Sequence, residues 1–144
     1  MVIRFLLDTN VTSELRKTDH PTTDPAFVDW ARSADLNEAA ISVMTIHEME
    51  RGALLIERRD VAQGAMYRSW IRELLGAFAD RLLPLTLKAA TRAAAYHVPD
   101  PVPLADSLIA ATAAEHGLTV VTRNTADFAR FDVPMLNPWE PPRP

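Results

Sequence analysis

The stretch VIRFLLDTN, residues Val2 to Asn10, decides the fold. Its apolar run from Val2 to Leu7 begins with β-branched residues and ends at a carboxylate, which predicts a short buried strand that delivers Asp8 to its end. The stretch LTVVT, residues 118–122, predicts a second buried strand, and Gly117 before it is a typical helix stop. The chain is therefore expected to form a sheet around these two strands.

Three more strands and six helices are expected along the chain. The strands fall at residues 39–44, 82–85 and 133–136, and the helices at residues 10–16, 26–36, 45–58, 61–78, 86–96 and 104–116. Asn10 is expected to cap the first helix, and Pro25 to open the second. Strands that alternate with helices are typical of a parallel α/β sheet covered on both faces, and such sheets place active sites beyond the carboxyl ends of their strands.

Size and composition suit one globular domain. The chain has 144 residues, of which 48% are hydrophobic and 24% charged, a balance that disfavours disorder, coiled coil and collagen. The absence of cysteine excludes disulfides and thiolate metal sites, and no apolar run approaches the roughly 20 residues of a membrane helix. A cytoplasmic protein is expected, with a domain over residues 1–137 and a proline-rich, poorly ordered tail over residues 138–144.

The charge distribution bears on nucleic-acid binding. A net charge of −4 counts against a general basic binder, but 13 of the 15 basic residues are arginine. Residues 51–72 contain five arginines and only two acids, so this stretch is either a phosphate-binding surface or a solvated helix surface. The candidate substrate-binding residues are Arg51, Arg58, Arg59, Arg68, Arg72 and Arg123.

Four acids stand where the expected topology converges: Asp8, Glu48, Asp106 and Asp127. Each has an ordinary explanation, as a helix cap, a helix-dipole partner, a loop carboxylate or, for Glu48, a partner of Arg51. Together they fit one crevice at the carboxyl ends of the strands, where a hard cation such as Mg²⁺ or Mn²⁺ would offset their repulsion. Such a site suits phosphodiester cleavage.

Other motifs fail on inspection. His47 and Glu48 begin a zinc-protease pattern, but Arg51 stands where the second histidine ligand is needed. The four scattered glycines form no phosphate-binding loop, although Gly52 hints at a close helix approach. The three tryptophans, at positions 30, 70 and 139, are expected to serve the core or an interface rather than to stack on bases.

Four segments resemble the PIN-domain ribonucleases, and most closely the VapC-type toxins of bacterial toxin–antitoxin pairs. They are FLLDTNVTSEL (5–15), ISVMTIHEMERGA (41–53), PLADSLIAATAAEHGLTVVTRNTADF (103–128) and VPMLNPWE (133–140). The resemblance implies a sheet of order 3-2-1-4-5 and a Mg²⁺ site with Asp8 and Asp106 as principal ligands. Glu48 would orient or deprotonate the attacking water, and Asp127 would complete the metal shell or position a second ion.

The resemblance also implies supporting residues and partners. Asn10, Thr122 and Asn124 would be polar neighbours of the site, with Asn10 holding Asp8, while His47 departs from the small or apolar residue usual there. The implied partners are a homodimer mate, an RNA substrate, a VapB-like antitoxin and, through that antitoxin, operator DNA. Two alternatives stay open: a DNA-binding regulatory partner with little nuclease activity, and a nuclease that acts on DNA.

Overall fold

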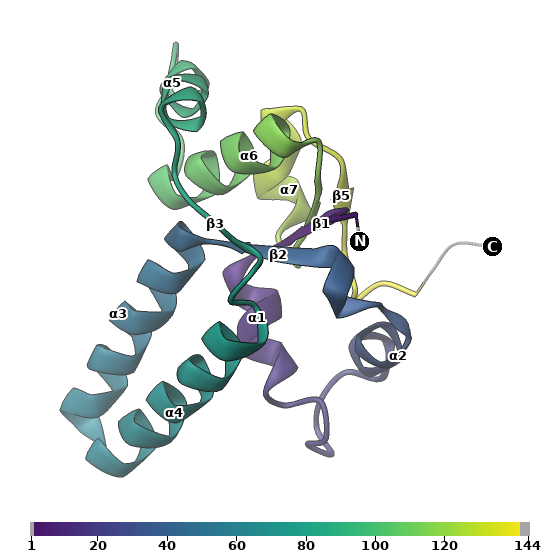
Figure 1. The fold of residues 1–144 in the computed structure, drawn as a ribbon, viewed down its shortest axis with the longest axis vertical. Coiled ribbons are helices and arrows are strands. Elements are labelled where there is room, and N and C mark those ends of the chain that lie inside the picture. Colours follow the sequence, from purple (N-terminus) through teal and green to yellow (C-terminus); the bar gives the residue numbers. More distant parts are fainter. Residues whose placement is uncertain (1, 142–144) are drawn as a thin grey trace.

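The structure, a computed structural model, describes residues 2–141 (Figure 1). Within that range the chain forms one five-stranded parallel sheet in the order β3-β2-β1-β4-β5, as the resemblance implied. The strands are β1 (Phe5–Leu7), β2 (Ala39–Ser42), β3 (Leu82–Leu83), β4 (Thr119–Val121) and β5 (Met135–Leu136). In the register, Leu7 of the central strand β1 lies between Ile41 of β2 and Val121 of β4.

Helices cover both faces of the sheet, which confirms the predicted α/β class (Figure 1). They are α1 (Thr9–Leu15), α2 (Pro25–Ser33), α3 (Val43–Arg59), α4 (Val61–Ala77), α5 (Leu87–Tyr96), α6 (Leu104–His116) and α7 (Thr125–Phe128), with 3-10 turns at Leu36–Glu38 and Ala129–Phe131. Helices α3 and α4 form a long hairpin that projects from the sheet, and α5 packs on α6 (Figure 1). None of the described helices has the length and apolar character needed to cross a bilayer.

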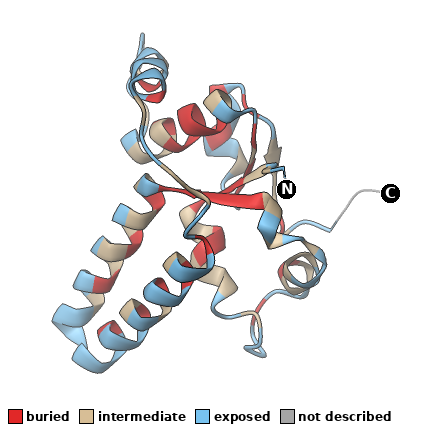
Figure 2. Cartoon of the chain, in the orientation of Figure 1, coloured by how far each residue is buried: buried red, intermediate tan, exposed pale blue. Residues whose placement is uncertain are grey.

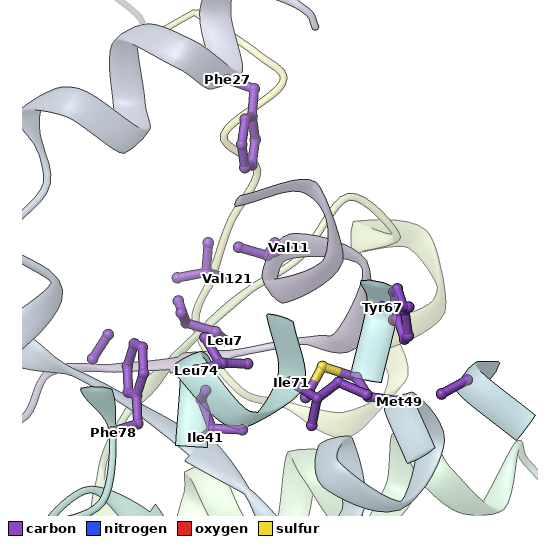
Figure 3. Packing of buried hydrophobic residues seen from close by; sticks show 12 residues of the cluster. Leu7, Val11, Phe27, Ile41, Met49, Tyr67, Ile71, Leu74, Phe78 and Val121 are labelled. Carbon is purple, nitrogen blue, oxygen red and sulfur yellow. The ribbon is translucent and has the colours of Figure 1, made fainter. Parts of the chain in front are cut away.

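Two apolar cores flank the sheet, because successive strand residues point to opposite faces. Leu7, Ile41 and Val121 pack with helices α1 to α4 on one face, and Figure 3 shows this cluster. Leu6 and Val120 pack against α6 and α7 on the other face. In Figure 2 strand β2 is buried along its length, and β1 and β4 are buried except at their half-buried first residues, Phe5 and Thr119, which explains why these strands are mostly apolar.

The expected cap of the first helix is wrong by two residues. Asp8, not Asn10, is the cap, and its side chain accepts a hydrogen bond from the backbone nitrogen of Thr9 (2.8 Å). Its extended backbone (φ −74°, ψ 161°) places the helix start directly after the strand. The second strand likewise ends at Ser42 rather than residue 44, because the Ser42 hydroxyl caps α3 through the Met44 nitrogen (3.0 Å).

Two further expectations need correction. The first two residues of the expected tail pack against the domain: Pro138 is buried, and the ring centre of Trp139 lies 4.7 Å from that of Phe27. Residues 142–144 of the expected tail lie outside the described range. The close helix approach occurs at Gly64, where a Cβ atom would lie 2.8 Å from the Glu57 Cα, whereas a Cβ atom at Gly52 would meet nothing within 4 Å.

Candidate active site

Asp8 lies at the carboxyl end of the central strand with only 4% of its surface exposed. Its backbone nitrogen donates to the Val121 carbonyl (2.9 Å), which fixes the end of β1 against β4. Its carboxylate accepts hydrogen bonds from the Thr9 nitrogen (2.8 Å), the Thr122 hydroxyl (2.8 Å) and the Asn10 amide (3.2 Å). Burial raises the pKa of Asp8, while these hydrogen bonds oppose the rise by stabilising the charged form.

The residues that hold Asp8 form a connected network across two strand ends. The Thr122 hydroxyl accepts from the Asn124 nitrogen (3.0 Å) while it donates to Asp8. The Asn10 side-chain oxygen accepts from the Arg123 nitrogen (3.2 Å). The loop after β4 is thus tied to the start of α1, and the Asp8 carboxylate is held in one orientation.

Thr9 joins Asp8 to the second acid, Glu48. Its backbone nitrogen donates to Asp8, and its hydroxyl donates to the Glu48 Oε1 atom (2.6 Å). Glu48 is half-buried on α3, and within residues 2–141 no ion pair joins it to Arg51. Sequence reasoning missed the role of Thr9, and the available signal was its place between Asp8 and Asn10 at the start of a helix.

Asp106 and Asp127 complete the group of acids. Asp106 lies in the first turn of α6, and Asp127 lies in the first turn of α7, a short helix that the sequence pattern did not predict. Burial raises the pKa of Asp106 to about 6, helped by the negative charges of Asp8, Glu48 and Asp127 and opposed by Arg130. The negative charges of Asp8, Glu48 and Asp127 therefore reach Asp106, and we call these four predicted acids the acidic cluster.

The acidic cluster has the donor chemistry of a hard-cation site. Its carboxylate oxygens are of the ligand type that Mg²⁺ or Mn²⁺ prefers, and a divalent cation would relieve the repulsion that Asp106 experiences from the other three acids. Across the described residues, no group of three or more His, Asp or Glu side chains is placed so that it could hold a metal ion. A cation at this position would be held by one or two of the carboxylates together with waters, as is usual for Mg²⁺.

The candidate substrate-binding arginines differ in their surroundings. Arg51, Arg58, Arg59 and Arg72 are exposed along the α3–α4 hairpin. Arg68 instead bridges the two helices of the hairpin, with ion pairs to Glu50 (3.3 Å) and Glu57 (2.8 Å). Arg123 lies in the loop beside the acidic cluster, with its guanidinium 5.1 Å from the centre of the Trp139 ring.

A groove of the described chain lies away from the acids. It has a volume of about 750 Å³ and runs between α2 and the C-terminal segment, with Trp30, Leu136 and Pro138 in its walls. None of the four acids lines it. We place the candidate active site at the acidic cluster, because that is where the perturbed carboxylates and their supporting hydrogen bonds lie.

The protein is a parallel α/β domain with Asp8 at the carboxyl end of its central strand and with the charges of Asp8, Glu48 and Asp127 acting on Asp106. The chain belongs to the PIN-domain family, whose model matches residues 5–134. It is 35% identical to Toxin FitB of Neisseria gonorrhoeae over 94% of this chain and 98% of the relative. It is 34% identical to VapC ribonuclease Y4jK of Sinorhizobium fredii over 95% of this chain and 99% of the relative.

A solved structure agrees with these relatives. The structure of FitAB bound to an IR36 DNA fragment contains a chain that superposes with a TM-score of 0.80 at 32% identity. The match covers 96% of this chain and 98% of that chain. The similarity therefore spans the whole domain, and it includes all the elements that carry the acidic cluster.

Proposed function

We propose that this chain is a Mg²⁺-dependent endoribonuclease toxin that hydrolyses phosphodiester bonds in structured RNA such as tRNA or ribosomal RNA. The acidic cluster carries the proposal, because burial and three neighbouring carboxylates raise the pKa of Asp106 to about 6. Two relatives whose similarity covers 94% and 95% of this chain support it, since one is named a toxin and the other a ribonuclease. Mn²⁺ is expected to substitute for Mg²⁺, because both are hard cations that prefer oxygen ligands.

Each acid has a distinct part in the proposed reaction. The bound cation would activate water and offset the negative charge that develops on the phosphate in the transition state. Asp8 and Asp106 would hold it, and the hydrogen bonds from Thr9 and Thr122 orient the Asp8 carboxylate and oppose the rise in its pKa. Glu48, with one oxygen held by Thr9, would orient the attacking water or accept its proton, and Asp127 would complete the shell.

The proposed partners follow from the relatives and the sequence motifs. A VapB-like antitoxin would inhibit the chain and carry it to operator DNA, as the FitAB complex on its DNA fragment suggests for a related protein. The toxin is expected to form a homodimer and to act in the cytoplasm. RNA would contact exposed arginines of the α3–α4 hairpin, and Arg68 is the weakest candidate because two glutamates already pair with it.

Cleavage assays on purified chain test the proposal. Wild type should cut tRNA or ribosomal RNA in Mg²⁺ or Mn²⁺ and lose activity in EDTA. Asp8→Asn and Asp106→Asn should each lower the rate by at least roughly 100-fold while the fold persists, because metal and water activation supply several kcal/mol of barrier reduction. Asp29→Asn, an exposed acid on α2 outside the cluster, is the matched control. Wild-type rates in either cluster variant would contradict the proposed roles.

A second candidate function rests on the DNA-bound relative. The chain would then bind operator DNA with its antitoxin and cleave little, or it would cleave DNA rather than RNA. Labelled RNA and DNA hairpins of matched sequence, offered together in Mn²⁺, separate these possibilities. Preferential loss of the RNA hairpin supports the ribonuclease, preferential loss of the DNA hairpin supports a DNA nuclease, and loss of neither supports the regulatory partner.

A further inference from the structure

The C-terminal segment reaches back to the loop beside the acidic cluster. The Trp139 ring lies 4.7 Å from the Phe27 ring of α2 and 5.1 Å from the Arg123 guanidinium carbon. An arginine over a tryptophan face is attracted by the electrons of the ring. Trp139 therefore connects the core at Phe27 to the side chain of Arg123, whose backbone nitrogen is hydrogen-bonded to Asn10 beside Asp8.

Backbone hydrogen bonds fix Arg123 from both sides. Its nitrogen donates to the Asn10 side chain (3.2 Å), and Asn10 in turn donates to Asp8. Its carbonyl accepts from the Asn137 amide (3.4 Å), whose oxygen accepts from the Trp139 nitrogen (2.9 Å). One residue thus bridges the carboxylate network and the C-terminal segment, so its position relative to Asp8 is set by both.

The charge of Arg123 is available to a ligand. Its side chain is exposed, and no carboxylate of residues 2–141 lies within ion-pair distance of it. Arg130, not Arg123, is the cation that offsets the raised pKa of Asp106. An aromatic face can orient a guanidinium without neutralising it, which leaves its hydrogen-bond donors for a phosphate.

We propose that Trp139 is a positioning residue that holds Arg123 at the edge of the acidic cluster, where the guanidinium binds a backbone phosphate of the RNA. This inference rests on the proposed function. It assigns Trp139 to substrate binding through Arg123, rather than to base stacking or to core packing alone. The Trp139 ring takes part in core packing through Phe27, and it also orients Arg123, whose guanidinium lies over the ring.

Equilibrium binding of a labelled RNA hairpin to the full chain, measured in EDTA over a range of salt concentrations, tests the inference. Arg123→Gln should weaken binding and reduce the slope of log affinity against log salt by about 0.7–0.9, the range for one lost phosphate contact to single-stranded or duplex nucleic acid. Trp139→Leu should weaken binding roughly 2- to 5-fold in the wild-type background, the range of an exposed cation–π contact. In the Arg123→Gln background it should have no further effect, because the group that it positions is gone.

Two more variants separate positioning from packing. Trp139→Phe keeps an aromatic face and should recover most of the lost affinity. Trp30 is the other tryptophan beside Phe27, with the two ring centres 5.7 Å apart, and it does not contact Arg123. Trp30→Leu should therefore leave RNA binding unchanged. Thermal melts establish that each variant is folded, and Arg123→Gln alters only an exposed side chain.

The outcomes are distinct. An unchanged salt slope in Arg123→Gln overturns the phosphate contact, and an equal Trp139→Leu effect in both backgrounds overturns the positioning role. Either result leaves the ribonuclease proposal standing if wild type still cuts RNA. A wild-type chain that neither binds nor cuts RNA contradicts the proposed function and this inference together.

Discussion

At the scale of single residues, Asp8 shows how one side chain can belong both to the fold and to the site. The ordinary explanation of Asp8 as a helix cap is correct, since it caps α1 through Thr9. The same carboxylate is nevertheless almost fully buried beside other acids, and burial raises its pKa. Structural and functional explanations of an acidic residue therefore do not exclude one another.

Asp106 should make the stability of the metal-free protein depend on pH. Its pKa of about 6 in the folded chain lies above the ordinary value of 3.8, so folding favours the protonated form. That contribution is fully present below pH 4 and is lost as the pH rises through 6. Asp106→Asn should therefore be more stable than wild type above pH 6, by about 1 kcal/mol once solvent screening of a half-buried group is allowed for.

Urea denaturation in EDTA between pH 4 and pH 7.5 measures this effect. The difference in unfolding free energy between Asp106→Asn and wild type should shrink toward the acid end of the range. A variant that is less stable than wild type at pH 7.5 would show that Asp106 serves mainly as a partner of the α6 dipole.

At the scale of helices and strands, strong patterns predicted the elements well and weak ones did not. Helix α6 has the predicted bounds, with Gly117 at its end in the left-handed conformation (φ 66°). The short helix α7 was missed, because four residues cannot show helical periodicity. The observed element ends differ from the predicted ones where a side chain caps the next helix, as at Asp8 and Ser42. The pattern of apolar residues alone does not show which polar side chain will cap a helix.

The α3–α4 hairpin offers a matched pair of glycine substitutions. Gly52→Ala should stabilise the protein by about 0.5–1 kcal/mol, since alanine favours the helix and its Cβ atom would meet nothing within 4 Å. Gly64→Ala should destabilise it by about 1–3 kcal/mol, because its Cβ atom would lie 2.8 Å from the Glu57 backbone. Thermal and urea melts of both variants measure the changes, and equal shifts of the same sign would contradict the packing of the hairpin.

At the scale of the whole molecule, the four acids come from segments spread over most of the chain. The predicted order of the strands explains why the charges of residues 8, 48 and 127 reach Asp106, and the sequence predicted these four acids as candidate site residues. The hydrogen bonds that orient these acids were harder to predict from the sequence. A contact such as that between Thr9 and Glu48 joins residues 39 positions apart and depends on how their side chains are placed. The stack of Arg123 on Trp139 was missed for the same reason, since it joins two loops.

Cation binding should stabilise the whole domain. A cation that binds only the folded chain at about 100 times its dissociation constant contributes roughly 2.7 kcal/mol. Millimolar Mn²⁺ should therefore raise the melting temperature of wild type well above its value in EDTA, and that of Asp106→Asn by much less. Asp29→Asn, outside the cluster, should gain as much as wild type. Equal gains in wild type and Asp106→Asn would remove Asp106 from the cation site.

The connection between α5 and α6 has a practical consequence for engineering. A cut near Asp100 would leave β1, β2, Asp8 and Glu48 on one fragment, and β4, β5, Asp106 and Asp127 on the other. One fragment would contain β1 and the other its partner β4, so the central strand pair would form only when the fragments associate. Each fragment would carry two of the four acids of the acidic cluster. Under the proposed function, RNA cleavage would then report that the fragments had reassembled, which makes this chain a candidate for a split-enzyme sensor.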